Sequence, residues 1–284
     1  MISASAPGKL NLFFSVGRTR DDGYHDVYSI YQAIGIRDFV KVAVAEADSL
    51  QITGSLSNEQ LDAVPKDQTN ICFLAARAFF EHNELDSTPL AIEIEKHIPV
   101  AAGLAGGSAD AAATLIALQE LFQTESDLYA IAAELGADVP FSLLGGTAIG
   151  SGSGTELEPI DSAEVEFLIA YPNQGISTKE SFALLDGLRA EKEEIQLRLP
   201  GSDFYEDLRL GEKPPQLGQN DLAVPALELM PSLQELIELG GNVSGSGPSV
   251  YFFEPDATLI SALQESEFSW VLTSGNQPGA RLEV

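Results

Sequence analysis

The chain has 284 residues and a formal net charge of −28, from 15 basic and 43 acidic residues. An acidic balance of this size argues against nucleic-acid binding, because such binding requires a cationic face. No run of about 18 apolar residues suggests a membrane span, and the first residues lack the pattern of a secretory signal. We therefore expect a cytoplasmic protein of one large domain or two small ones.

The first expected element is a strand over residues 1–16. Alternation places Lys9 and Asn11 on the same face of this strand. Since polar side chains share that face, the strand is expected to be half exposed. The segment Asp22-Gly23 then predicts a hairpin turn.

The dipeptide Tyr24-His25 follows this turn directly. An aromatic ring beside a hydrogen-bonding imidazole suits the recognition of a planar base. Ordinary loop packing explains the pair equally well from the sequence alone.

A helix is expected over residues 70–80, with Thr69 or Asn70 as its N-cap. The only cysteine, Cys72, lies within its apolar pattern. A single cysteine excludes an internal disulfide, and we expect Cys72 to be a small core residue.

A glycine-rich loop separates a strand predicted over 90–94 from an alanine-rich helix that ends near Phe122. Gly103, Gly106 and Gly107 allow a positive φ and a close approach by a ligand. The start of the helix presents unpaired N–H groups and the positive end of the helix dipole. Such an arrangement predicts an anion site, and a phosphate group is its usual ligand.

Two well-known phosphate loops are excluded by spacing. A P-loop requires a lysine after the last glycine, and none follows Gly107. The loop also lacks the G-x-G-x-x-G spacing of a dinucleotide-binding fingerprint. Plain turn chemistry remains the alternative for this loop.

A further helix is expected over 127–134, and the segment Gly136-Ala-Asp-Val-Pro140 follows it. Asp138 has two interpretations. Its carboxylate either caps the next helix, with Pro140 in the first turn, or takes part in chemistry.

The second half of the chain mixes strands and helices again. Residues 189–218 are charged and contain prolines, so we expect a mobile connection there. The remaining expected elements are a strand over 166–171, a helix over 177–188, helices over 220–239 broken by Pro231, a second glycine loop over 242–250, a strand over 250–253, a helix over 259–268 and a strand over 269–273.

Six motifs occur in a fixed order along nearly the whole chain: Ala6-Pro-Gly-Lys-Leu-Asn-Leu-Phe-Phe14, Arg20-Asp-Asp-Gly-Tyr-His25, Pro99–Ala112, Gly136-Ala-Asp-Val-Pro-Phe141, Asn220-Asp-Leu222 and Ser244-Gly-Ser-Gly-Pro-Ser249. In this order they resemble the GHMP kinases, which phosphorylate small molecules. The D-G-Y-H turn and the K-L-N-L and G-A-D-V-P segments resemble the branch that acts on 4-diphosphocytidyl-2-C-methyl-D-erythritol. The glycine loops alone indicate only a GHMP kinase.

The resemblance implies an α+β fold of two domains with the active site in the cleft between them. The expected domains are residues 1–158, which bind ATP, and residues 159–284. The implied activity is ATP-dependent phosphorylation of the 2-hydroxyl of the cytidyl substrate, in isoprenoid precursor biosynthesis. ATP and Mg²⁺ are then required, and the partner is a small molecule rather than a nucleic acid or a membrane.

The resemblance also implies roles for single residues. Asp138 is the base that accepts the hydroxyl proton, and Lys9 pairs with it. The ATP phosphates are wrapped by the glycine loop, Pro99, Val100, Ala101, Ala102, Gly103, Leu104, Ala105, Gly106, Gly107, Ser108 and Ala109, with the Ser108 hydroxyl near the phosphates or Mg²⁺. We expect Asp110, slightly further along the helix, to cap the helix rather than to bind metal.

The substrate side of the implied site uses four residues. Asn11 contacts the erythritol part, and the cytosine is held by Tyr24, His25 and Phe182. In this arrangement the rings of Tyr24 and Phe182 lie against the faces of the base, and His25 lies at its polar edge.

Two positions depart from the family pattern. Ala105 replaces a usual glycine, so its backbone must avoid a positive φ or bear strain. His97 replaces a frequent arginine near the nucleotide.

Two alternative functions remain open at this point. A kinase of mevalonate or homoserine type would leave Tyr24 and His25 without a base to bind. A non-catalytic ATP-binding regulator of the same fold would be expected to lack Asp138 or Lys9, and this chain has both.

Overall fold

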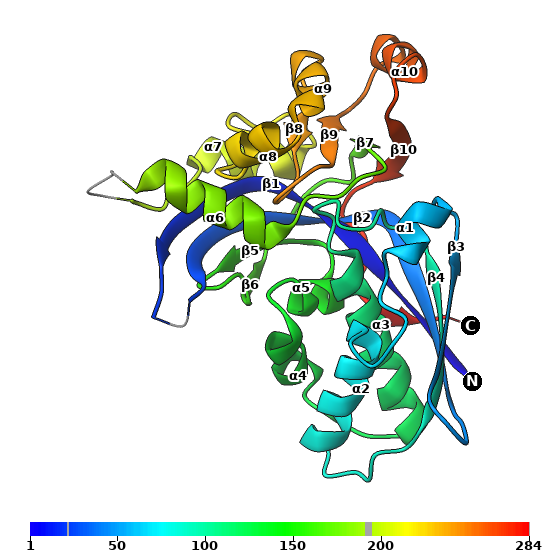
Figure 1. The fold of residues 1–284 in the computed structure, drawn as a ribbon. Coiled ribbons are helices and arrows are strands. Elements are labelled where there is room, and N and C mark those ends of the chain that lie inside the picture. The colour runs from blue at the N-terminus through cyan, green and yellow to red at the C-terminus, as the bar shows by residue number, and fades with distance from the viewer. Residues whose placement is uncertain (22, 191–194, 284) are drawn as a thin grey trace.

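The computed structural model describes residues 1–21, 23–190 and 195–283, and these form two β-sheets with helices around them (Figure 1). The larger sheet has the strand order β11-β1-β2-β4-β3, and β5 and β6 extend it from β2. Of its paired strands, β3 and β4 are parallel. The strands are β1 (Ile2–Thr19), β2 (His25–Val44), β3 (Ser49–Gly54), β4 (Leu90–Lys96), β5 (Thr147–Ser151), β6 (Glu156–Pro159) and β11 (Arg281–Leu282).

Strands β1 and β2 form a long antiparallel hairpin in which Thr19 lies opposite His25. The expected turn is therefore confirmed, although Asp22 itself lies outside the described residues. From residue 4 to residue 17, β1 is buried on both faces, so the expectation of a half-exposed strand was wrong. Helix α3 (Gly106–Phe122) packs on one side of the hairpin, and side chains from the second half of the chain, such as Phe204 against Phe13, pack on it as well.

Helices α2 to α5 cover one face of the larger sheet (Figure 1). Helix α2 begins after Asn70, whose side-chain oxygen accepts a hydrogen bond from the Cys72 amide at 2.9 Å, so Asn70 is the N-cap. Cys72 is a free, fully buried thiol, as expected. The helices on this side are α1 (Asn58–Asp62), α2 (Ile71–His82), α3 (Gly106–Phe122), α4 (Leu128–Leu135) and α5 (Val139–Leu144).

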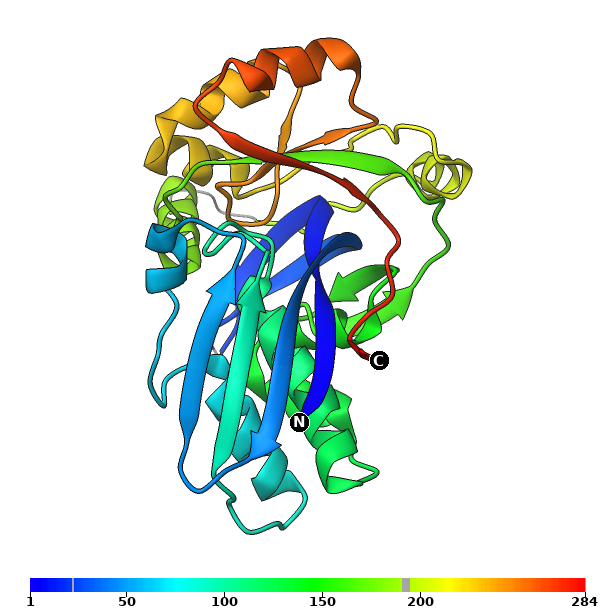
Figure 2. The same cartoon turned by 90° about the vertical axis from the view of Figure 1, so that its right-hand side faces the viewer.

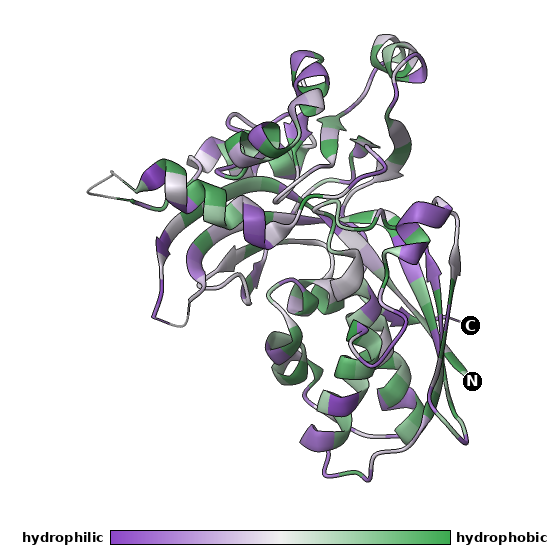
Figure 3. Cartoon of the chain, viewed as in Figure 1, coloured by the Kyte–Doolittle hydropathy of each residue, from purple (hydrophilic) through white to green (hydrophobic). Residues whose placement is uncertain are grey.

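Helix α3 is the centre of this layer because its alanines let neighbouring elements approach closely. It contacts β1, β2, α2, α4 and α5. The helices α2, α3 and α4 carry hydrophobic residues where they pack together, whereas α1 is largely hydrophilic (Figure 3). The fully buried alanines on α3 are Ala109, Ala111, Ala112, Ala113 and Ala117.

The smaller sheet has the strand order β10-β7-β9-β8, and helices α8 to α10 lie on its outer side (Figure 2). Ser177 caps α6 through the Glu180 amide, which agrees with the helix start predicted from the sequence. The elements are β7 (Glu166–Tyr171), α6 (Thr178–Arg189), α7 (Ser202–Leu210), α8 (Ala223–Leu229), the 3₁₀ turn η1 (Pro231–Leu233), α9 (Gln234–Glu238), β8 (Asn242–Val243), β9 (Val250–Phe253), α10 (Ala257–Gln264) and β10 (Ser269–Ser274).

The stretch 189–218 is not simply a mobile connection. It contains helix α7, from which Phe204 and Leu208 are buried in the core. The helix forms because these two apolar residues, spaced four apart, face the hairpin despite the charged residues between them. The expectation was therefore wrong for residues 202–210, and residues 191–194 lie outside the described part.

The fold is the expected α+β architecture with two halves. Strand β6 (Glu156–Pro159) contains residue 158, the expected boundary, and the second sheet begins seven residues after Pro159, at Glu166. The chain then returns, because β11 pairs with β1 of the first sheet. The division at residue 158 remains a prediction.

Among the described residues, no helix combines the length and the apolar character that crossing a membrane requires.

Candidate active site

A cleft of about 1080 Å³ lies between the glycine loop, the β1–β2 hairpin and helix α6. One end is lined by the loop before α3, which we call the nucleotide end. The other is lined by the β1–β2 turn and α6, which we call the base end. Lys9 and Asp138 line the cleft as well. Of the residues predicted from the sequence, Leu104 and Ala109 are instead fully buried in the core.

The glycine loop takes backbone conformations that leave its amides available. Ala101, Gly103 and Ala105 have φ values of 51°, 77° and 59°. In the described part of the chain, the backbone amides from Gly103 to Ser108 donate no hydrogen bond to other protein groups. Unpaired amides before and at the start of a 17-residue helix form an anion site.

The carbonyl groups of the same loop are bonded to the second half of the chain. The amides of Ile176 and Ser249 donate to the oxygens of Ala101 and Ala102, each at 3.1 Å. The Ser244 hydroxyl donates to the Gly103 oxygen at 3.3 Å. These hydrogen bonds to the carbonyl groups fix the position of the loop, while its amides stay unpaired.

Ala105 adopts the left-handed conformation, with φ 59° and ψ 34°. Of the two outcomes expected at this departure from the family pattern, the structure shows the strained one. A left-handed conformation costs an L-residue with a Cβ about 1–2 kcal/mol.

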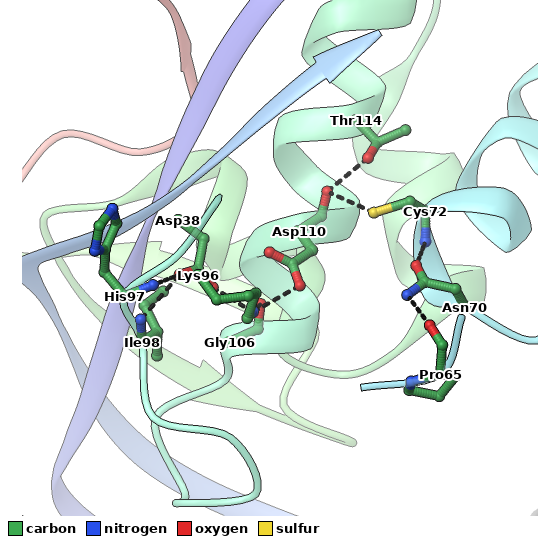
Figure 4. A network of polar contacts seen from close by, with 10 residues as sticks. All are labelled: Asp38, Pro65, Asn70, Cys72, Lys96, His97, Ile98, Gly106, Asp110 and Thr114. Atoms are coloured by element: carbon green, nitrogen blue, oxygen red, sulfur yellow. Dashed lines mark hydrogen bonds and ion pairs between the residues drawn. The ribbon is translucent and has the colours of Figure 1, made fainter. Parts of the chain in front are cut away.

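A buried ion network fixes both ends of the loop (Figure 4). The Lys96 ammonium lies between Asp38 and Asp110, and its Nζ donates to Asp110 Oδ2 at 2.7 Å. Asp38 Oδ1 accepts the amides of His97 and Ile98 at 2.6 and 2.9 Å, directly before the loop. Strand β2, the end of β4 and the first turns of α3 are thereby joined.

Asp110 does not cap the helix as expected. It lies inside α3, and its carboxylate pairs with Lys96 instead. The second oxygen, Oδ1, is buried without a hydrogen-bond partner among the described residues. Burial raises the pKa of Asp110 to about 8, and the nearby Asp38 carboxylate adds to this while Lys96 opposes it.

Lys9 and Asp138 meet, although 129 positions separate them in the sequence. Lys9 Nζ lies 3.8 Å from Asp138 Oδ2 and donates to Asn11 Oδ1 at 2.6 Å. Asn11 Nδ2 donates in turn to Ser29 Oγ at 2.7 Å. Lys9 is buried, and this burial lowers its pKa, with the Asp138 charge offsetting part of the effect.

Asp138 occupies the N-cap position of α5, but its side chain makes no capping hydrogen bond. The capping interpretation is therefore correct for the position and wrong for the carboxylate. About a third of the Asp138 side chain is exposed, at 32%, and the residue lines the cleft. Its carboxylate is thus available to a ligand.

Tyr31 is a site residue that the sequence analysis missed. Its ring is buried beneath Lys9, with Nζ 5.8 Å from the ring centroid, and it lines the cleft. Burial raises the pKa of the Tyr31 phenol, and the neighbouring Asp138 carboxylate adds to the rise. Tyr31 lies inside an apolar strand pattern, so no sequence signal distinguishes it from a core tyrosine.

At the base end, the ring of His25 stacks on Phe182, with centroids 5.0 Å apart and planes at 29°. His25 Nε2 lies 2.8 Å from Asp186 Oδ1 of helix α6. Tyr24 lines the same cleft and is 59% exposed. The structure brings the three predicted residues together, but it places Phe182 against His25 rather than against Tyr24.

His97 lies away from this cleft. Its ring nitrogens contact Ser55 Oγ at 2.7 Å and Glu95 Oε1 at 3.2 Å. It is not among the described residues that line the cleft.

The described residues contain no cluster of three or more His, Cys, Asp or Glu suited to a metal ion. This is compatible with Mg²⁺ that arrives with a nucleotide, because Mg²⁺ is usually bound by one or two protein oxygens together with substrate phosphates. The Ser108 hydroxyl, in the nucleotide end, has the required oxygen chemistry.

An α+β fold with a phosphate loop before α3 and a lysine–aspartate pair in the cleft defines a kinase of the GHMP class. Residues 70–146 match the family model of the GHMP kinases N terminal domain. Homoserine kinase from Cytophaga hutchinsonii shares the fold, with a TM-score of 0.70 at 16% identity over 99% of this chain and 97% of that one.

Two further relatives are more similar. A 4-diphosphocytidyl-2-C-methyl-D-erythritol kinase from Paenarthrobacter aurescens is 39% identical over 99% of this chain and 95% of that protein. The crystal structure of a 4-(cytidine 5'-diphospho)-2C-methyl-D-erythritol kinase has a TM-score of 0.76 at 30% identity, over 97% of this chain and 100% of that one. The chain belongs to the 4-diphosphocytidyl-2-C-methyl-D-erythritol kinase family.

Proposed function

We propose that this protein transfers the γ-phosphoryl group of ATP to the 2-hydroxyl of 4-diphosphocytidyl-2-C-methyl-D-erythritol, as a cytoplasmic enzyme of isoprenoid precursor biosynthesis. The observation that carries the proposal is the Lys9–Asp138 pair, which lies in the same cleft as an anion loop and an aromatic base end. A phosphoryl donor and a cytidyl acceptor at the two ends bring their reacting groups to this pair.

In this mechanism Asp138 accepts the proton of the 2-hydroxyl as its oxygen attacks the γ-phosphorus. The bond from that phosphorus to the β–γ bridging oxygen breaks, and ADP leaves. Lys9 stabilises the negative charge that develops between the attacking oxygen and the γ-phosphoryl group. Its hydrogen bond to Asn11 holds it in position. Catalysis of this kind depends on positioning and charge stabilisation.

The nucleotide end holds the phosphates through the amides from Gly103 to Ser108. Ser108 would hold Mg²⁺ there through its hydroxyl oxygen. The ion supplies neutralisation of the phosphate charge. In a protein with a net charge of −28, local neutralisation of the ligand is especially important.

At the base end, Tyr24, His25 and Phe182 hold the cytosine, and Asn11 contacts the erythritol part. All four residues line the cleft. A mevalonate- or homoserine-type substrate has no planar base and would leave this aromatic group unused.

The test is ADP release with ATP and Mg²⁺ against the cytidyl substrate, mevalonate, homoserine and galactose. Turnover with the cytidyl substrate alone is the expected result. Turnover with another acceptor would overturn the substrate assignment and keep the kinase. ATP binding without turnover on any acceptor would favour the non-catalytic regulator instead.

A further inference from the structure

The contact between His25 and helix α6 crosses the cleft between the two halves of the molecule. His25 opens β2 in the first sheet, and Asp186 lies on α6, which belongs to the second half. Their side chains meet at 2.8 Å, and both residues line the cleft. The carboxylate therefore contacts the imidazole within the base end itself.

The contact is directional because a carboxylate only accepts hydrogen bonds. A neutral imidazole carries its proton on one of two nitrogens, and the partner of one nitrogen decides which. Because Asp186 Oδ1 can only accept, a hydrogen bond across this contact requires the proton on Nε2. Thr19 Oγ1, at 3.2 Å from the same nitrogen, can accept from the same N–H group. The other nitrogen, Nδ1, then carries a lone pair and accepts.

The orientation of the ring is fixed by a second contact from the same helix. Phe182 lies one turn before Asp186 on α6 and stacks on the imidazole at 5.0 Å. Its side chain packs in turn with a cluster of Phe14, Val16, Val27, Leu185 and Leu222. One helix therefore contacts both the Nε2 edge and the face of the His25 ring.

Helix α6 is anchored where it ends. Arg189 donates to the Val16 carbonyl at 2.7 Å and pairs with the buried Asp221 at 3.0 Å. Asp221 also accepts the Val16 amide at 2.7 Å. The distance between α6 and the hairpin is thereby fixed close to the His25–Asp186 contact.

We infer that Asp186 is the positioning residue that holds His25 with an accepting Nδ1, and that it thereby makes the base end select cytosine over uracil. The reason is the base edge: cytosine presents an amino donor at position 4, whereas uracil presents a carbonyl acceptor there. An accepting nitrogen pairs with the donor and repels the acceptor. A site that leaves a buried polar group unpaired rejects the wrong ligand strongly. This inference rests on the proposed function.

The experiment compares Asp186→Ala with Asp186→Asn in the full chain. Asp186→Ala is expected to raise the KM for the cytidyl substrate about tenfold, the effect of losing one charge-assisted hydrogen bond. Inhibition constants of CDP and UDP, measured against that substrate, should become nearly equal. Asp186→Asn keeps an acceptor for Nε2–H and should restore most of the preference. The kcat and the KM for ATP should stay within about twofold.

Nitrogen chemical shifts of the His25 imidazole supply a readout that a merely structural role would not move. The wild type should show the Nε2–H tautomer, and Asp186→Ala should show a mixture. Glu180→Ala, which removes an exposed acidic residue from the first turn of the same helix, is the matched control and should change neither property.

Two results would overturn the inference. One is an Asp186→Ala variant with unchanged preference for CDP over UDP. The other is a uniform loss of kcat and of both substrate affinities, which would indicate a structural role. A wild type that does not phosphorylate the cytidyl substrate would instead contradict the proposed function, so the two failures are distinguishable.

Discussion

The two ends of the cleft are built in different ways. The nucleotide end consists of backbone: amides point to the ligand, and carbonyls are bonded to the second half of the molecule. The base end consists of side chains from two separate elements, which meet through one stack and one hydrogen bond. A backbone site binds what all nucleotides share, and a side-chain site can distinguish one base from another.

The largest expected effect concerns the pair that joins these ends. Asp138→Asn and Lys9→Met should each lower kcat by about 10²–10⁴, the range for acid–base groups. Because neither residue forms the nucleotide loop or the base stack, both KM values should stay within a few-fold. Steady-state kinetics with both substrates checks this.

Asp86→Asn and Lys41→Met alter exposed residues and serve as controls. Near-wild-type turnover in either site variant would remove that residue from the mechanism.

The second prediction concerns a substitution that disturbs the nucleotide end alone. Gly103 has a φ of 77°, and a Cβ there would lie 2.3 Å from the Ser244 carbonyl oxygen. Gly103→Ala should therefore lower the free energy of unfolding by at least about 2 kcal/mol and raise the KM for ATP more than that for the cytidyl substrate. Thermal unfolding and kinetics measure both.

Gly107 supplies the matched control for stability. Its φ is not positive, and a Cβ there would meet no atom within 4 Å. Gly107→Ala should unfold at nearly the wild-type temperature. Equal destabilisation by the two substitutions would contradict the explanation from backbone conformation.

The third prediction concerns pH and the ion network behind the loop. The pKa of Asp110 is raised to about 8 in the folded protein, from 3.8 for an unperturbed group. The folded state thus holds a proton that the unfolded state has lost, and this stability is present at low pH and disappears as pH rises through about 8.

Asp110→Asn keeps the shape of the side chain but removes the group that gains and loses the proton. Its stability relative to the wild type should therefore improve by about 1 kcal/mol or more between pH 4 and pH 8, as measured by urea unfolding. Asp86→Asn is the control. Parallel profiles for Asp110→Asn and the wild type would show that Asp110 does not hold the proton.

The smallest expected effect is at Ala105. A glycine at position 105 would adopt the left-handed conformation without the Cβ penalty, but it would lose more backbone conformational entropy on folding. Ala105→Gly should therefore stabilise the protein by about 0.5 kcal/mol. Ala113→Gly, at a buried helical position of α3, should destabilise it by about 1 kcal/mol. The same sign for both would contradict the assignment of strain to Ala105.

The sequence predicted well where a local signal determines the structure. The N-caps of α2 and α6 and the hairpin after Thr19 follow from such signals. Helix α7 was missed because its helicity depends on where Phe204 packs. Propensity along 189–218 carries no information about that distant surface.

The site shows the same division. Motif order and the resemblance predicted Lys9, Asp138, their pairing and the loop. The Lys96 network was missed because its two aspartates, Asp38 and Asp110, are 72 positions apart. In the sequence, each of them looks like an ordinary surface residue. Tyr31 and Asp186 acquire their roles only through neighbours that the fold supplies.

The hydrogen bonds from the second half of the chain to the loop carbonyls have a consequence for binding at both ends of the cleft. The Ile176 amide that donates to Ala101 lies two residues before helix α6, which carries Phe182 and Asp186. This hydrogen bond links the segment before α6 to the phosphate loop, so a displacement of α6 by a bound base would couple the two ends of the cleft. Such coupling is reciprocal: the factor by which one ligand changes the affinity for the other is the same in both directions. Binding of either substrate would then change the affinity of the cleft for the other.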